Sequence, residues 1–180
     1  MIFEPTPLEG AWVVSLDPFE DDRGHYARVF CNKEFEAHGI DSKMVQMNTV
    51  FSKKAGTLRG MHYQTSPHAE SKFVRCIRGA LYDVMVDMRP ESPTYRQYFG
   101  IELSVNNQRM LYVPENFAHG FLSLEDNTEA CYFVGAYYAP DCQGGFGYDD
   151  PAVGIQWPVP VTVLSQKDKQ WPLLDRPSGT

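Results

Sequence analysis

Short runs of β-branched and aromatic residues, separated by glycine, proline and asparagine, dominate the middle of the chain. The clearest runs cover residues 72–78 and 81–88, and they end at Gly79 and at Arg89-Pro90. Partial alternation of apolar and polar positions within such runs is typical of β-strands. The same pattern predicts further strands at residues 98–103, 110–113, 121–124 and 129–135, with turns at Asn106-Asn107 and Asp126-Asn127.

One segment predicts a helix instead. Asn32 can cap its first turn, residues 33–38 follow, and Gly39 is placed to end it. Many short strands beside a single helix predict an all-β sandwich or barrel. The stretch that starts at Gly154 and continues into a proline-rich tail is expected to pack outside the barrel, with little regular structure.

The composition predicts one ordered domain that spans residues 1–180. Hydrophobic residues make up 43% and charged residues 22%, which argues against disorder. The net charge of −7 argues against nucleic-acid binding, which needs clustered Lys and Arg. No apolar run approaches the roughly 20 residues of a membrane span, and no signal peptide is visible at the start. We therefore expect a cytoplasmic protein that makes no membrane contact.

The residues most suited to chemistry are concentrated in residues 56–64, with the sequence GTLRGMHYQ. Arg59 and His62 are three positions apart, and residues at odd spacing on a regular strand face opposite sides of the sheet. They can share a site only if Gly60 introduces a bulge or bend, which glycine permits. Histidine suits proton transfer near neutral pH, and arginine suits binding of a phosphate. The alternative is a structural histidine and a surface arginine.

A metal site is the obvious rival interpretation of His62. Barrels of this type often bind metal through an H-x-H pair, a later Glu and a distant His, but here the pair reads His62-Tyr63-Gln64. His119 and Glu70 could complete a site of two histidines and one carboxylate for iron or zinc. The four cysteines are scattered and lack the C-x-x-C spacing of a zinc site.

Three further residues gain a chemical interpretation only in combination. A lysine that opens an apolar strand, such as Lys72, is usually a solvated edge residue. Considered alone, Tyr132 is predicted to be a core residue, and Asp168 is predicted to be an exposed residue in a charged segment.

A series of short segments makes the combination specific, because they follow one another in a fixed order over nearly the whole chain. They are Phe19–Gly24, Leu58–Gln64, Lys72, Arg78-Gly79, Val86–Arg89, Ser92–Thr94, Val113–Phe121, Tyr137–Pro140, Asp149–Pro151, Gly154–Pro158 and Lys167-Asp168. Together these segments resemble the dTDP-4-dehydrorhamnose 3,5-epimerases, a family of metal-free cupin-type enzymes. The resemblance implies an all-β, cupin-type jelly-roll barrel with a few short peripheral helices.

The resemblance also implies a reaction. Members of the family invert C3 and C5 of dTDP-4-dehydro-6-deoxyglucose, and both carbons flank the C4 ketone, so loss of either proton gives an enolate. By resemblance His62 is the base, Asp168 holds its other ring nitrogen, and Tyr132 is the acid on the opposite face. Lys72 would lie beside the C4 oxygen and stabilise the enolate, so no metal and no other cofactor is implied.

The remaining matches are implied contacts with a sugar nucleotide. Arg23 and Arg59 correspond to pyrophosphate and nucleotide contacts, and Tyr138 corresponds to a residue that stacks on the nucleotide. Family members are typically dimers in which the amino-terminal strand of one subunit completes the site of the other, so a homodimer is expected. The expected substrate-binding residues are Phe19, Arg23, Arg28, Gln46, Asn48, Arg59, His119, Tyr138, Gln143 and Lys167.

Some positions depart from the family pattern. Arg28 and Gln143 stand where Glu is common, Gly147 replaces an Arg, and residues 49–52 lack the His and Arg found in many members. All four catalytic positions remain, so the departures bear on the identity of the substrate, including its nucleotide base, more than on the type of reaction. The alternatives left open are a single-centre epimerase on a related 4-keto sugar nucleotide, a metal-dependent cupin enzyme and a non-catalytic carbohydrate-binding module.

Overall fold

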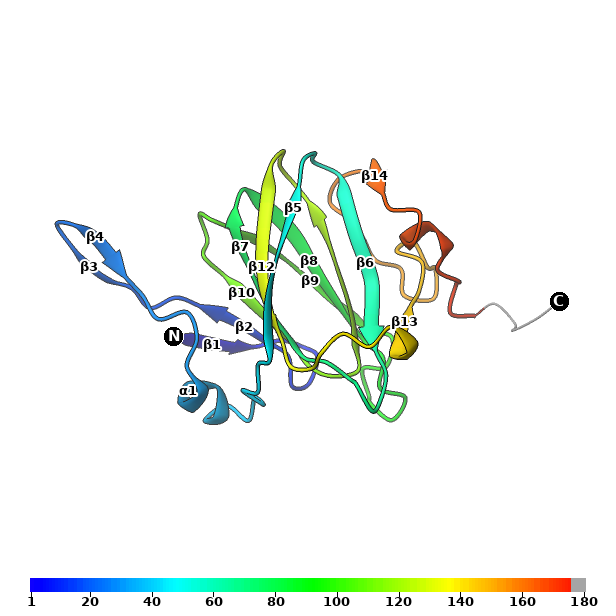
Figure 1. The fold of residues 1–180 in the computed structure, drawn as a ribbon, viewed down its shortest axis with the longest axis horizontal. Helices are drawn as coiled ribbons and strands as arrows, with labels where there is room; N and C mark the ends of the chain where they lie inside the picture. Colours follow the sequence, from blue (N-terminus) through cyan, green and yellow to red (C-terminus); the bar gives the residue numbers. More distant parts are fainter. Residues whose placement is uncertain (176–180) are drawn as a thin grey trace.

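The computed structural model describes residues 1–175. Within these residues the strands form two six-stranded sheets and a separate two-stranded hairpin (Figure 1). The first sheet has the order β1 (Ile2–Pro5), β2 (Trp12–Ser15), β10 (Met110–Val113), β7 (Lys72–Arg78), β12 (Thr128–Val134) and β5 (Gln46–Ser52). The second has the order β13 (Gln143–Gly145), β6 (Thr57–Gln64), β11 (Phe117–Ser123), β8 (Ala80–Asp87) and β9 (Tyr98–Ser104), with β14 (Val163–Leu164) also paired to β6. The hairpin consists of β3 (Phe19–Asp21) and β4 (Gly24–Tyr26).

The main hydrophobic core lies between the two large sheets. Val74 and Leu111 reach it from the first sheet, and Leu81, Met85 and Phe121 reach it from the second. Complete burial of such a side chain stabilises the fold by about 1.5–3 kcal/mol relative to exposure. Two antiparallel sheets closed around a shared core form a jelly roll, so the predicted all-β fold class is confirmed.

Most predicted strands are present, with shifted ends. The strands expected at 72–78 and 110–113 have the predicted bounds. The strand expected at 121–124 begins earlier, at Phe117, and ends at Ser123. This strand lies between β6 and β8 and is buried along its whole length, so its Ala118-His119-Gly120 segment needs no alternation of polar and apolar residues.

The predicted helix is shorter than expected. Helix α1 covers Asn32–Glu36, and its N-cap is Cys31, which makes no side-chain capping bond. The prediction that Asn32 caps the helix is therefore wrong, because Asn32 is already its first helical residue. Gly39 follows the last turn with a φ of +71°, a left-handed conformation that suits glycine, as the sequence predicted. Within residues 1–175 no helix is long and apolar enough to cross a membrane.

From Gly154 to residue 175 the chain has little regular structure, as predicted, but part of it and the preceding β13 pair with β6. β13 pairs with Gln64 and its neighbours, and β14 runs parallel to the first residues of the same strand. Two short 3-10 helices, η1 (Pro140–Cys142) and η2 (Asp168–Gln170), flank these strands, in agreement with the predicted peripheral helices. This arrangement holds the C-terminal segment against one edge of β6, where it contributes to a cavity.

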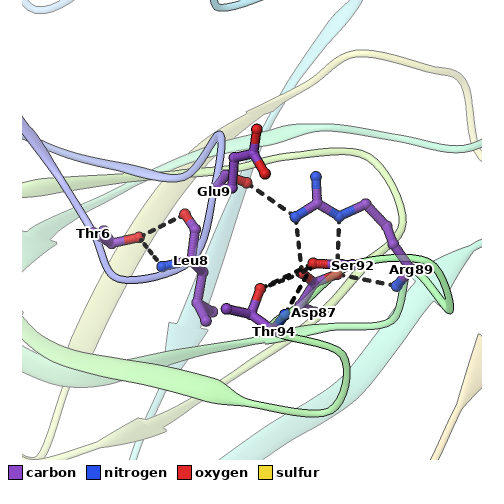
Figure 2. A network of polar contacts seen from close by, with 7 residues as sticks. All are labelled: Thr6, Leu8, Glu9, Asp87, Arg89, Ser92 and Thr94. Atoms are coloured by element: carbon purple, nitrogen blue, oxygen red, sulfur yellow. Dashed lines mark hydrogen bonds and ion pairs between the residues drawn. The ribbon is translucent and has the colours of Figure 1, made fainter.

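A buried carboxylate organises the end of β8 (Figure 2). Asp87, which is completely buried, accepts hydrogen bonds from Arg89, Ser92 and Thr94 at 2.6–2.9 Å. Arg89 also donates to the carbonyl oxygen of Glu9, which ties the amino-terminal loop to the β8–β9 connection. Burial alone would raise the pKa of Asp87, but these hydrogen bonds outweigh it and lower the pKa to about 2.

We expect Asp87→Asn to destabilise the fold by about 2–3 kcal/mol at pH 7, because several partly buried donors lose a charged, buried acceptor. The folded pKa of Asp87 is below its usual value of 3.8, so its stabilising contribution is present above pH 4 and is lost as pH falls towards 2. Denaturant unfolding of the parent and the variant at pH 7 and at pH 2.5 measures this difference. Asp126→Asn, in an exposed pair with Lys54, is the matched control and should change little. A variant difference that is the same at both pH values would contradict the role of the charge.

Candidate functional site

A cavity of about 730 Å³ opens inside the jelly roll, and both large sheets line it. Eleven of the fourteen predicted site residues lie on its wall. The predicted residues that line the cavity are Gln46, Asn48, Arg59, His62, Lys72, His119, Tyr132, Tyr138, Gln143, Lys167 and Asp168.

The bend predicted at Gly60 brings Arg59 and His62 to the same cavity. His62 pairs with His119 and Arg59 pairs with Phe121, so β6 has one more residue than β11 over this stretch. Gly60 has a φ of +133°, and a Cβ there would lie 2.5 Å from the Cα of Gly120. Only glycine fits this bulge, which turns both side chains inward as the sequence analysis required.

His62 forms a dyad with Asp168. The Nε2–H of His62 donates to Oδ1 of Asp168 at 2.6 Å, and the aspartate is buried. Although 106 residues separate them, the pairing of β14 with β6 brings η2 next to His62. The Oγ of Ser165 accepts a hydrogen bond from the Asp168 backbone N–H and fixes that turn. With Nε2 committed to the carboxylate, Nδ1 is the ring nitrogen that can accept a proton.

Burial lowers the pKa of His62, because it disfavours the charged imidazolium. The contact with Asp168 opposes this shift, and the positive charges of Lys72 and Lys167 add to it. The net effect is a pKa below 6.5, so the imidazole is neutral at pH 7. A neutral imidazole oriented by a buried carboxylate is suited to act as a general base.

Tyr132 reaches the cavity from the other sheet. It lies on β12, whereas His62 lies on β6, so the phenol and the imidazole approach the cavity from opposite sheets. Burial raises the pKa of Tyr132, the negative charge of Glu70 raises it further, and Arg59 opposes these effects. The phenol is therefore protonated at pH 7 and can donate a proton.

Lys72 supplies a positive charge beside these two groups. It is the first residue of β7, next to β12, and its side chain is 11% exposed. Its Nζ lies 3.1 Å from a carboxylate oxygen of Glu70. Lys72 is therefore not the solvated edge residue that a lysine at the start of a strand usually is, because β7 is an interior strand of its sheet and Lys72 faces the cavity, where the resemblance places it.

Several polar side chains near these groups already contact one another. Gln46 donates to Asn48 at 2.7 Å, and Arg59 donates to the carbonyl oxygen of Phe51 at 3.2 Å. Lys167 donates to Gln143, whose Oε1 also lies 3.5 Å from the hydroxyl of Tyr138. These contacts place cations and amides around the cavity, which suits a polar, anionic ligand.

The metal alternative lacks its ligand set. Among the described residues, no group of three His, Cys, Asp or Glu side chains is arranged to hold a metal ion. His119 instead donates from Nε2 to the buried Asp83 at 2.7 Å, and Glu70 pairs with Lys72. Asp83 was missed by the sequence analysis, although an aspartate in the middle of the apolar run at residues 81–88 marks a buried polar group.

The three remaining predicted residues, Phe19, Arg23 and Arg28, do not line this cavity. Phe19 and Arg23 lie in the β3–β4 hairpin, which projects away from the jelly roll (Figure 1). Phe19 is 70% exposed, and the guanidinium of Arg23 pairs with Asp21 within the hairpin. Arg28 pairs instead with Glu34 at 2.6 Å. Within one chain, therefore, the structure does not bring these three residues to the predicted site.

The apolar part of the cavity wall has no signal in the sequence, because its residues look like ordinary strand positions. Ser165 and Thr57 add two hydroxyls that sequence reasoning also missed. The apolar lining residues are Val50, Leu58, Phe121, Val134, Val163 and Leu164.

Comparison with known proteins identifies the family. The family model described as dTDP-4-dehydrorhamnose 3,5-epimerase matches residues 5–176 of this chain. The chain belongs to this family. Among the members of this epimerase family, the dTDP-4-dehydrorhamnose 3,5-epimerase of Sinorhizobium fredii is 43% identical over 175 residues, which cover 97% of this chain and 90% of that protein.

Solved and curated relatives extend the comparison. The crystal structure of dTDP-4-dehydrorhamnose 3,5-epimerase from Bacillus anthracis, with TDP and PPi bound, superposes with a TM-score of 0.92 at 40% identity. The match covers 96% of this chain and 99% of that one. A dTDP-4-dehydrorhamnose 3-epimerase from Streptomyces niveus is 34% identical over 97% of this chain and 84% of its own length. The epimerase family therefore includes a protein named for inversion at C3 alone.

Proposed function

We propose that this chain, an isomerase of the epimerase family, inverts C3 and C5 of dTDP-4-dehydro-6-deoxyglucose to give dTDP-4-dehydrorhamnose. The observation that carries the proposal is the placement of a neutral imidazole and a protonated phenol on opposite sheets around one cavity. Epimerisation needs a base on one face of the carbon and an acid on the other. A binding module needs neither group.

The proposed reaction uses four residues for each inversion. His62 removes the proton from the carbon next to the C4 ketone, and the electron pair of the C–H bond moves into the enolate. Asp168 stabilises the imidazolium that forms. The ammonium of Lys72 stabilises the negative charge on the C4 oxygen, and Tyr132 then gives a proton to the opposite face of the carbon. Proton exchange with solvent restores both residues.

The polar end of the cavity supports binding of the nucleotide part. Arg59 and Lys167 are the cations on the wall besides Lys72, and they suit the pyrophosphate. Gln46, Asn48 and Gln143 supply donors and acceptors for further polar contacts. In a thermal-shift panel of dTDP, UDP, CDP and GDP, dTDP is expected to stabilise the protein most. A larger shift with another nucleotide would show that the substrate carries a base other than thymine. The departure from the family pattern at Arg28 is the reason to test this.

Deuterium incorporation tests the reaction. In deuterated water, the protein should place deuterium at both C3 and C5 of dTDP-4-dehydro-6-deoxyglucose, with both centres inverted. Exchange and inversion at one carbon alone would instead establish the single-centre alternative. One relative, from Streptomyces niveus, is named as a 3-epimerase. Absence of exchange at either carbon would contradict the proposed function.

We also propose a homodimer in which the β3–β4 hairpin of one subunit completes the cavity of the other. The hairpin supports this proposal because it projects from its own barrel and leaves Phe19 and Tyr26 more than two-thirds exposed. Arg23 then serves the partner's site. The cytoplasmic location expected from the sequence stays a prediction.

Mixing two inactive variants tests this arrangement. Arg23→Ala and His62→Ala homodimers should each lose activity, whereas a mixed dimer contains one cavity with His62 and an intact hairpin from its neighbour. Activity should therefore return when the two variants exchange subunits. Failure of the mixture to regain activity, with native mass spectrometry showing that mixed dimers have formed, would place the hairpin outside the partner's site.

A further inference from the structure

Glu70 is a carboxylate in the cavity wall that the reaction above does not use. It precedes β7 by two residues, its side chain is 14% exposed, and Oε1 lies 3.1 Å from the Nζ of Lys72. Removing a carboxylate from water is costly unless it is paired, so a negative charge at this position needs a physical reason. Among the described residues, Lys72 is its ion-pair partner.

The charge also lies where it affects the proposed acid. β7 pairs with β12 along the strand that carries Tyr132, and Glu70 and Tyr132 line the same cavity. A phenolate that formed there would be repelled by the carboxylate. In agreement with this placement, burial raises the pKa of Tyr132 and Glu70 raises it further.

We propose that Glu70 is a positioning residue of the epimerase reaction, which holds the Lys72 ammonium against the cavity wall and disfavours a negative charge on the Tyr132 oxygen. This inference rests on the proposed function. One carboxylate would thereby serve both the group that stabilises the enolate and the group that returns the proton. Because it acts through Lys72 and Tyr132, Glu70 itself touches no reacting atom.

The other charges around the cavity do not replace this role. Arg59 on β6 is positive and opposes the effect of Glu70 on Tyr132, and Lys167 near η2 is also positive. Asp168 is bonded to His62, and His119 on β11 is bonded to Asp83 behind it. Glu70 is therefore the lining carboxylate of the described structure that is not committed to a histidine.

The pH profile of Glu70→Gln is the first test, since the amide keeps the shape and removes the charge. The alkaline limb of kcat should move to lower pH by about 0.5–1 unit, because the phenol ionises more easily without the carboxylate. Glu70→Asp restores the charge and should return the limb towards the parent position. Glu129→Gln removes a carboxylate from the same strand as Tyr132 but outside the cavity, and should leave the limb in place.

The ion pair with Lys72 is tested by a double variant. In Lys72→Met the unpaired carboxylate would repel the enolate, so adding Glu70→Gln should partly restore kcat. An alkaline limb that does not move in Glu70→Gln, or a double variant no faster than Lys72→Met, overturns the proposal. A kcat of the double variant equal to that of Lys72→Met would show that Glu70 does not act on the charge of the enolate.

A spectroscopic titration separates this inference from the proposed function. The absorbance of Tyr132 phenolate is obtained as the difference between each protein and its Tyr132→Phe counterpart, and it requires no turnover. Its midpoint should fall by about 0.5–1 pH unit in Glu70→Gln. A parent protein that shows no epimerisation would refute the proposed function, whereas an active parent with an unchanged Tyr132 midpoint would refute the role of Glu70 alone.

Discussion

His62→Ala should lower kcat/KM by roughly 10²–10⁴-fold, which is the usual contribution of a general base. Its imidazole is the neutral group of the cavity that a buried carboxylate orients, through the 2.6 Å bond between Nε2 and Asp168. Without it, neither C3 nor C5 should exchange its proton with deuterated solvent at an appreciable rate. Parental exchange at both carbons in the variant would remove His62 from the role of base.

The control for this prediction is His68→Ala. His68 is exposed and lies outside the cavity, so its substitution should leave both exchange rates unchanged. Asp168→Asn should also lose activity, because the amide no longer stabilises the imidazolium.

The pH dependence of the parent provides a second check on His62. Burial lowers its pKa, so the base stays neutral to a lower pH than an ordinary imidazole, and the acid limb of kcat/KM should lie below pH 6.5. A limb above pH 6.5 would show that the charge of Asp168 outweighs burial.

The sequence predicts the strands of this fold better than it predicts their partners. Runs such as residues 72–78 carry the strand pattern in their own composition, and the structure reproduces their bounds. The pairing of β14 with β6 depends on residues more than 100 positions apart. No local pattern encodes that contact, so the residues around Asp168 in the sequence predict a surface position, although Asp168 is buried against His62.

The candidate site shows the same division between local and distant information. The bulge at Gly60 was predictable because Arg59 and His62 had to share a face, and glycine is the residue that allows it. The resemblance to the family then supplied Tyr132 and Lys72, which their own surroundings in the sequence do not distinguish. Residues in the β3–β4 hairpin lie outside the cavity of their own chain, so their predicted role depends on a second subunit.

Tyr132→Phe should separate the two proton transfers of the proposed reaction. The substitution keeps the aromatic ring and removes only the hydroxyl, which supplies the proton on the face opposite His62. Formation of inverted product should fall by roughly 10²–10⁴-fold. His62 still removes the substrate proton, exchanges it with solvent and returns it to the same face. Deuterium should therefore enter the substrate while its configuration is retained.

This outcome distinguishes the acid from a residue that only shapes the cavity. Loss of packing or of nucleotide binding would slow deuterium entry and inversion together, whereas loss of the acid slows inversion alone. Tyr137→Phe, at an exposed position outside the cavity wall, is the matched control and should change neither rate. If Tyr132→Phe inverts both centres at the parental rate, another group delivers the proton, and the phenol at this position serves the structure alone.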